Sequence, residues 1–215
     1  MGVMTKYIVG AVVLIILLGG GYYLLQGSKG ASSAPPGGGT PSPMGVATST
    51  YATSTFSVVY PNDYTLDASY AYDQVNPKKP IYGVKFTIPG TVATGTNLAS
   101  DTYISVEQLP HAKNCTGDIY LAANVKSQTI NDNGVQYSLA TSSGAAAGNI
   151  YEEAVFALPG SQPCTAVRYF VHSSNIGNYP PGAVQPFDGQ ALLAAFDTIR
   201  RSLVLNAAGP MPTTP

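Results

Sequence analysis

Polar and apolar residues alternate along most of the chain between residues 55 and 172, and this pattern restricts the fold more than any other feature. The stretch IYGVKFTIP places Val84, Phe86 and Ile88 on one side of an extended chain, and CTAVRYFVH does the same with Val167 and Tyr169. Such alternation is typical of half-buried β-strands, since successive side chains point to opposite faces. We expect further strands at TFSVVYP, YTLDASYAY, DTYISVEQL, VKSQTI, VQYSLAT and NIYEEAVFALP.

Turn-forming sequences separate these stretches. The sequence YPND is predicted to join the first two strands into a hairpin, NDNG to join VKSQTI to VQYSLAT, and GSQP to precede CTAVRYFVH. Asparagine, glycine, aspartate and proline favour the backbone angles of tight turns, and short turns connect antiparallel neighbours. The run SSGAAAG is predicted to be a loop. The sheet is therefore expected to be antiparallel.

Helical signals are fewer. Residues 116–125 are predicted to form a short helix, and a longer one is expected after Asp188, which can cap its first turn. Leu192, Phe196 and Ile199 form an apolar stripe on that helix. Many strands with two helices predict an α+β fold, an antiparallel β-sheet flanked by helices.

Residues 7–25 carry no charged or strongly polar side chain. As a helix, these residues would span roughly 28 Å, against a bilayer core of about 30 Å. The fold is thus expected to be preceded by one N-terminal transmembrane helix.

Two interpretations of this segment remain open, an uncleaved anchor and a cleaved secretory signal. The best small-residue cleavage site, ASSA, is followed by Pro35 and Pro36, a poor context for cleavage, so an anchor is favoured. Lys6 and the amino terminus on one side, against Lys29 on the other, favour a cytoplasmic N-terminus. The prediction is a single-pass protein of the cell membrane with an extracytoplasmic C-terminal domain.

Composition divides the chain into five segments. They are a cytoplasmic start at 1–6, the transmembrane anchor at 7–25, a flexible Gly/Pro/Ser linker at 26–50, the α+β domain at 51–205 and a disordered tail at 206–215. Only 10% of residues are charged and the formal net charge is −1, so nothing points to a nucleic-acid partner.

The two cysteines, Cys115 and Cys164, are predicted to form a disulfide, because an even pair in an exported domain is most simply one bridge. The alternative is a reactive thiol at Cys164 with His172 as its base. In a strand these two residues share a face but lie about 26 Å apart, too far for a hydrogen bond.

No other constellation predicts catalysis. Glu152 and Glu153 are adjacent and would point to opposite faces of a strand, which does not suit paired carboxylates. No histidine, cysteine or carboxylate spacing matches a metal site, and no phosphate-binding loop is present. We predict no catalytic residues, no metal and no cofactor.

The chain contains 15 tyrosines. Tyr70 and Tyr72, together with Tyr179 on the loop NIGNYPPG, are candidates for a surface that binds a protein or a glycan. The alternative is that the tyrosines line half-buried strands.

Three stretches, FSVVYPNDY, GVKFTIP and FDGQALLAAFDTIRRSL, resemble the PsbP-like fold, an α/β/α sandwich found in the extrinsic photosystem II protein and non-photosynthetic bacterial relatives. The chain is also similar to membrane-anchored bacterial proteins without an assigned activity. The resemblance covers about 150 residues and implies a non-catalytic accessory or binding domain, with no site residues. We therefore expect a tethered binding protein of the cell envelope with a protein or glycan partner; the alternatives are an envelope hydrolase and a structural surface protein.

Overall fold

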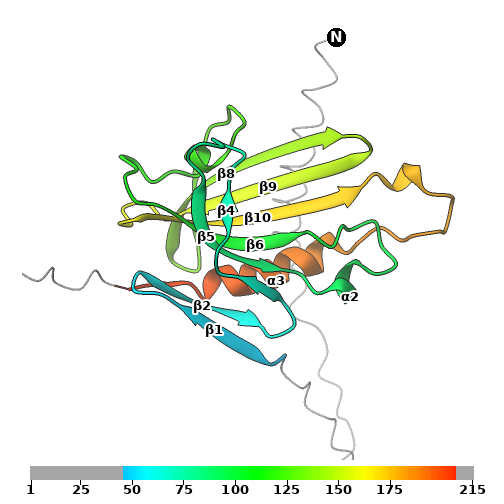
Figure 1. The fold of residues 1–215 in the computed structure, drawn as a ribbon, viewed down its shortest axis with the longest axis horizontal. Coiled ribbons are helices and arrows are strands. Elements are labelled where there is room, and N and C mark those ends of the chain that lie inside the picture. The colour runs from blue at the N-terminus through cyan, green and yellow to red at the C-terminus, as the bar shows by residue number, and fades with distance from the viewer. Residues whose placement is uncertain (1–45, 207–215) are drawn as a thin grey trace, which may run out of the picture. The chain divides into compact units, whose positions relative to one another are not determined.

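The computed structural model describes residues 46–206 (Figure 1). Antiparallel strands dominate, and only one helix is longer than a single turn. The strands are β1 (Thr48–Ala52), β2 (Phe56–Pro61), β3 (Thr65–Asp67), β4 (Ala71–Tyr72), β5 (Ile81–Thr87), β6 (Tyr103–Leu109), β7 (Gln128–Asp132), β8 (Val135–Ala146), β9 (Asn149–Ala157), β10 (Cys164–Ser174) and β11 (Val204–Leu205). The helical elements are α2 (Gly90–Ala93), α3 (Gly189–Arg201) and the 3₁₀ turns η1 (Gly117–Tyr120) and η2 (Ile176–Asn178).

The strands form two sheets. The large sheet has the order β3-β5-β6-β10-β9-β8-β7, with β4 also paired to β5, and the small sheet has the order β1-β2-β11. All neighbouring strands are antiparallel, as predicted. The first strand begins at Thr48, inside the range predicted as linker.

Two predicted connections are wrong. The predicted hairpin around YPND does not form, because β2 pairs with β1 and β11 while β3 pairs with β5. This turn instead passes the chain from the small sheet to the large one. The predicted loop SSGAAAG is strand, since β8 continues to Ala146 and turns into β9 through Ala147 and Gly148, both with positive φ. The small side chains of this run do not prevent it from pairing with β9, so the strand continues.

The turn NDNG is confirmed as the β7–β8 hairpin turn. Asn133 and Gly134 have φ of 50° and 81°, a left-handed conformation that these two residue types tolerate. The register places Asp132 opposite Val135, so the loop has two residues.

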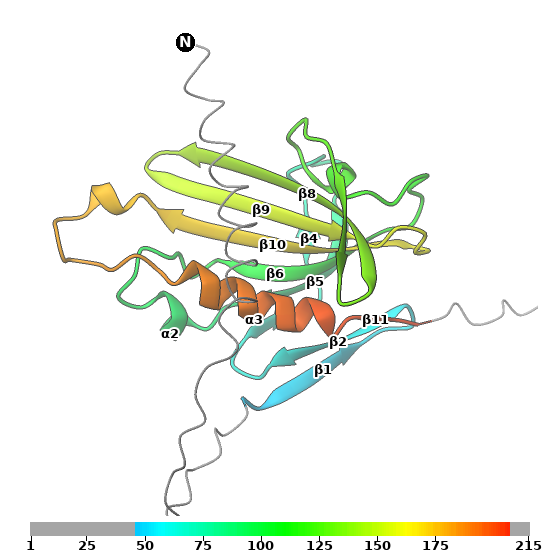
Figure 2. The ribbon, with the colours of Figure 1, turned by 180° about the vertical axis from the view of Figure 1, so that it is seen from behind.

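The helix α3 is confirmed at the predicted position. The Asp188 carboxylate accepts a hydrogen bond from the Ala191 N–H at 3.0 Å, and Leu192, Phe196 and Ile199 are buried. Figure 2 shows α3 between the large sheet and the small one. Its apolar stripe packs in a core with Tyr169 of β10, whose ring centroid lies 5.3 Å from that of Phe196.

The predicted α+β sandwich with helices flanking the sheet is wrong: the fold is dominated by the antiparallel sheet. The region predicted as a helix at 116–125 contains only the four-residue turn η1. Gly117 leaves space for that turn to approach the sheet closely, and Tyr120 inserts into a second apolar cluster. Loop residues therefore cover this face where a helix was expected.

Candidate functional site

The predicted disulfide between Cys115 and Cys164 is confirmed. It joins the loop that follows β6 to the first residue of β10, across 49 positions of sequence. Tyr120 of the same loop donates a hydrogen bond from its hydroxyl to the Cys164 carbonyl at 2.7 Å. The bond and the buried tyrosine together fasten the loop over one face of the large sheet.

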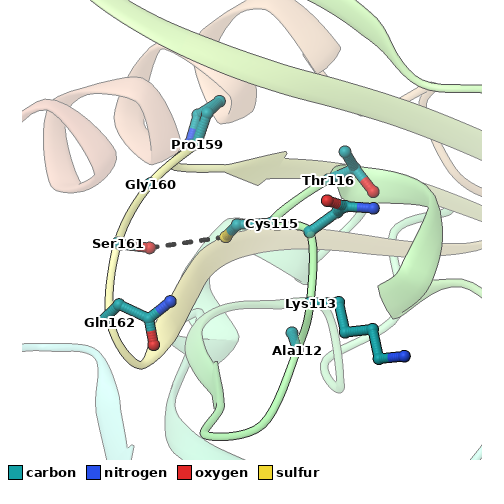
Figure 3. Close-up of a pocket in the computed structure, with 9 residues that line it drawn as sticks. Ala112, Lys113, Cys115, Thr116, Pro159, Gly160, Ser161 and Gln162 are labelled. Carbon is teal, nitrogen blue, oxygen red and sulfur yellow. Dashed lines mark hydrogen bonds between the residues drawn. The ribbon is translucent and has the colours of Figure 1, made fainter.

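A hollow of about 350 Å³ lies beside the disulfide, between residues 112–116 and 159–162 (Figure 3). The Ser161 hydroxyl lies 3.5 Å from the Cys115 sulfur. This hydroxyl donates to the Leu158 carbonyl and accepts from the Thr165 N–H, each at 2.8 Å. Its hydrogen bonds hold the turn before β10, so Ser161 is not positioned as a nucleophile.

The alternative pairing of Cys164 with His172 is not present in the structure. The two residues lie at opposite ends of β10, and the Cys164 sulfur is bonded to Cys115. His172 Nδ1 lies instead 2.7 Å from a carboxylate oxygen of Asp101. A cysteine nucleophile with a histidine base is therefore excluded at this site.

A buried charged cluster lies under the loop that the disulfide fastens. Arg168 of β10 is fully buried and donates from Nε and Nη2 to the two carboxylate oxygens of Glu107, at 2.7 and 2.9 Å. Its Nη2 also donates to the Tyr120 carbonyl at 2.7 Å, and its Nη1 donates to Glu153 at 3.1 Å. The ring of Tyr72 covers the guanidinium, 3.6 Å from ring centroid to Cζ. Both charges of the Arg168–Glu107 pair are thus satisfied without water.

The electrostatics of this cluster follow from burial and charge pairing. Burial alone would lower the pKa of Arg168, but the carboxylate of Glu107 outweighs it and raises that pKa. Burial raises the pKa of Tyr70, and the nearby charge of Glu107 raises it further. Burial likewise raises the pKa of Tyr72. The cluster is a stable ion pair surrounded by neutral phenols.

Glu153 connects the cluster to the surface. Its side chain is 14% exposed, whereas that of Glu107 is fully buried. One Glu153 oxygen accepts from the Tyr72 hydroxyl at 2.7 Å, and the other accepts from Ser142 at 3.2 Å. Glu152 is exposed and alternates with Glu153 along β9, so only Glu153 belongs to this face.

A row of neighbouring aromatic rings continues from the cluster across the same face of the sheet. We call it the aromatic row; it consists of Tyr70, Tyr103, Phe170, Tyr151 and His172. Successive ring centroids are 5.5, 4.8, 6.2 and 4.6 Å apart. Phe170 lies directly opposite Tyr103 on β6, and His172 directly opposite Tyr151 on β9. Cross-strand pairing therefore creates the row.

The outer half of the row is partly exposed. Phe170, Tyr151 and His172 are half-buried, while Tyr70 and Tyr103 are buried. In Figure 1 no labelled helix or strand lies over the outer halves of β8, β9 and β10. The partly exposed rings are bordered by two carboxylates. That of Asp101 lies beside His172, and that of Glu153 belongs to the residue directly opposite Phe170 on β9.

Lys85 adds a positive charge at the inner end of the row. Its Nζ lies 5.3 Å from the Tyr70 ring centroid and 5.7 Å from that of Tyr103. The Tyr70 and Tyr103 hydroxyls are hydrogen-bonded to each other at 2.7 Å. The surface thus combines flat apolar rings with fixed carboxylates and an amine, a combination common in ligand sites.

The predicted tyrosines are separated by the fold. Tyr70 and Tyr72 are 8% and 6% exposed. Their rings are therefore buried, although the sequence-based prediction places them on a binding surface. Tyr179, after η2, is 36% exposed and lies outside the aromatic row. Only Tyr70 joins the row, and a binding role for the three residues stays a prediction.

Sequence reasoning missed Tyr151, Phe170 and His172 as a group, and Glu107 as the partner of Arg168. Each lies on a strand that the alternation identified, at a position of the correct parity for one face. Their neighbourhood depends on strand order and register, for which a single sequence carries no signal. One signal was available: Phe170 and His172 are two positions apart on the same strand, so their rings lie on the same face of the sheet.

A second charged cluster has a structural role. Arg200 of α3 donates to Asp132 at 2.7 Å and to Asp197 at 2.9 Å, and its Nε donates to the Tyr169 hydroxyl at 2.7 Å. A hydrogen bond from Arg201 is the main reason that the pKa of Asp132 is lowered. These contacts tie the helix to the β7–β8 turn.

Within residues 46–206, no group of three or more histidines, cysteines or carboxylates is arranged to hold a metal ion. No helix in this same range is long and apolar enough to cross a membrane. The anchor predicted at 7–25, most of the linker and most of the predicted tail lie outside the described residues.

No protein-family model matches the chain, and no curated protein matches it in sequence. The resemblance to PsbP-like domains therefore stays a prediction.

Proposed function

We propose that the chain is a non-catalytic binding protein of the cell envelope, tethered by residues 7–25, whose extracytoplasmic domain binds a glycan on the aromatic row. The observation that carries this proposal is the set of half-buried rings, Phe170, Tyr151 and His172, that lie beside one another at the sheet face. Flat rings pack against the C–H face of a sugar ring, and neighbouring carboxylates accept hydrogen bonds from its hydroxyls.

The groups that could have supported hydrolysis are engaged elsewhere, which favours binding over catalysis. Cys164 is in a disulfide, and Glu107 is fully buried against Arg168. A glycosidase needs two carboxyl groups that reach the substrate from either side of the scissile bond. Of the two carboxylates at Arg168, only Glu153 is partly exposed.

The binding proposal is tested with the full chain in a mild detergent. We expect a soluble oligosaccharide of β-linked N-acetylglucosamine to bind in calorimetry, and Tyr151→Ala to weaken that binding at least about tenfold, through loss of one stacking surface. Tyr82→Ala is the matched control, because Tyr82 is 64% exposed and lies outside the row. Equal losses in the two variants, or no binding by the unmodified chain, would show that the row is not a glycan site.

The same samples test the hydrolase alternative. The oligosaccharide is incubated with the full chain, and its length is followed by chromatography. We expect the length of the oligosaccharide to stay unchanged. Shortening that Glu153→Gln abolishes would contradict a purely binding role.

The predicted tether is tested in cells. Sequencing of the mature N-terminus and protease treatment of spheroplasts are expected to show an intact residue 1–25 segment and a digestible C-terminal domain. A mature chain that begins after residue 25 would contradict the anchor.

A further inference from the structure

Part of the outer edge of β8 has no strand partner among residues 46–206. The strand β7 pairs only with β8 residues 135–139, while β8 and β9 remain paired as far as Ala146. Residues 141–146 therefore form the end of the large sheet in this region, at the upper margin of Figure 1. Backbone N–H and C=O groups of alternate residues point outward along such an edge.

The free edge lacks the devices that normally protect a sheet edge. Its sequence, Thr-Ser-Ser-Gly-Ala-Ala, has no charge and no proline, and its register with β9 has no bulge. Charged residues, prolines and bulges are the usual means of preventing edge pairing. All but Ser142 of these six residues are exposed.

The opposite edge of the same sheet is protected, which makes the contrast informative. Strand β3 has only three residues there, and Asp67 forms an ion pair with Lys85 at 3.6 Å. A short, charged edge repels a second strand, whereas the long neutral edge of β8 accepts one.

The occupant that best fits this edge is the same edge of a second copy. Two neutral strands can approach to the usual spacing of about 4.8 Å without placing like charges together. Small side chains on both faces leave the approach unhindered. Antiparallel pairing of two identical strands also creates a closed two-fold dimer, since each copy contacts the same residues of the other.

We propose that two copies of this chain pair antiparallel along residues 141–146 of β8, which makes one continuous sheet across the dimer. The two-fold axis is then perpendicular to the sheet, so both aromatic rows lie on the same face. The pairing involves backbone groups and does not depend on glycan binding. A single strand pair is a small interface, so the dimer is expected to be weak and reversible.

Disulfide trapping detects such a weak dimer. Both native cysteines are bonded to each other, so one introduced cysteine is the single free thiol. We expect Ser143→Cys or Gly144→Cys, tested separately in the full chain in detergent, to give a crosslinked dimer under mild oxidation, because two-fold antiparallel pairing places one of these two positions opposite its own copy. Tyr82→Cys is the control, because Tyr82 is 64% exposed but lies on β5, where it pairs with β4 on one side and β6 on the other. We expect at least about ten times less crosslink from it, since only pairing brings two thiols within bonding distance.

A charge variant tests the same edge without a thiol. Ser143→Lys with Ala145→Lys places four positive charges along the paired edges, and we expect sedimentation to show loss of the dimer. Val135→Lys is its control, because Val135 is also exposed on β8 but lies where β7 already pairs. The proposal is wrong if the unmodified chain remains monomeric at high concentration, if the lysine pair leaves the dimer intact, or if Tyr82→Cys crosslinks equally well.

Discussion

Arg168 is the residue on which the disulfide-covered face is organised. It donates hydrogen bonds to Glu107, Glu153 and the Tyr120 carbonyl from a fully buried position. A buried ion pair adds little net stability compared with an apolar pair of the same size. Loss of one partner, however, leaves the other charge unpaired in a low-dielectric interior. Removal of one partner is therefore expected to cost more stability than the intact pair adds.

The first prediction concerns this pair. Arg168→Met is expected to lower the free energy of unfolding by about 3–5 kcal/mol, because Glu107 then remains buried without a cation. Arg168→Met combined with Glu107→Met is expected to recover most of that loss, as measured by guanidinium denaturation.

Arg201→Met is the matched control for this experiment. The Arg201 side chain is 42% exposed, and its ion pair with Asp132 is expected to contribute about 1 kcal/mol or less. A double variant that is no more stable than Arg168→Met alone would contradict the assignment of the loss to a stranded charge.

At the scale of the element, β5 and β6 approach each other closely at Gly83. A Cβ built on Gly83 would lie 2.1 Å from the Val106 carbonyl oxygen, whereas one built on Gly144 of β8 meets nothing within 4 Å. Neither glycine has a positive φ, so steric contact alone distinguishes the two positions.

The second prediction compares these two glycines. Gly83→Ala is expected to destabilise the protein by about 1–3 kcal/mol, because backbone atoms of β6 would have to move. Gly144→Ala is expected to be neutral or to stabilise by about 0.5 kcal/mol, since alanine lowers the entropy of the unfolded chain. Thermal denaturation of both variants measures the difference, and equal midpoints would contradict the close contact.

The disulfide acts on a larger element, the segment 115–164 that contains η1, β7, β8 and β9. The third prediction is that Cys115→Ala with Cys164→Ala lowers the free energy of unfolding by about 4 kcal/mol, from the loop entropy of the unfolded chain. A reductant is expected to lower the melting temperature of the unmodified chain and to leave that of the double variant unchanged. Insensitivity of the unmodified chain to reductant would contradict a stabilising bond.

At the scale of the whole molecule, the tyrosines couple the fold to alkaline pH. Burial is the main cause of a raised pKa in six of them, and for Tyr64 it raises the pKa to about 12. The others, whose pKa burial also raises, are Tyr70, Tyr72, Tyr103, Tyr120 and Tyr169. In the unfolded chain a tyrosine releases its proton at a pKa of about 10.

The fourth prediction follows from this difference. Up to about pH 10 both states keep these protons, so the stabilisation is fully present; above it the unfolded state releases protons that the folded state retains, and stability falls. Each such tyrosine contributes a slope of about 1.4 kcal/mol per pH unit. Denaturation at a series of pH values, with phenolate absorbance, measures this loss.

Tyr64→Phe serves as the internal comparison. Without the Tyr64 hydroxyl, the slope between about pH 10 and 12 should decrease by the share of one tyrosine. If phenolate absorbance shows that more than nine of the 15 tyrosines ionise near pH 10 while the protein remains folded, the assignment of these six tyrosines to the interior is contradicted.

Local sequence patterns were sufficient to predict most strands, the longer helix and the disulfide. Alternation identified the strands, including β10 with Val167, Tyr169 and Val171 buried on one face, and the cap and stripe identified α3. The disulfide was also predictable, because two cysteines allow only one bridge within the chain. These features depend on residues that are near one another in sequence, or on the number of cysteines, so they can be predicted from the sequence alone.

The contacts between strands and helices could not be predicted from the sequence, because they depend on how the whole chain packs. Which strands are neighbours brought Glu107 to Arg168, and the register brought Tyr151 to His172. The region 116–125 became a 3₁₀ turn under a disulfide because it packs against the sheet there, which overrides weak helix propensity. Strand order and register are set by the sum of many long-range contacts, and no local pattern in one sequence specifies that sum.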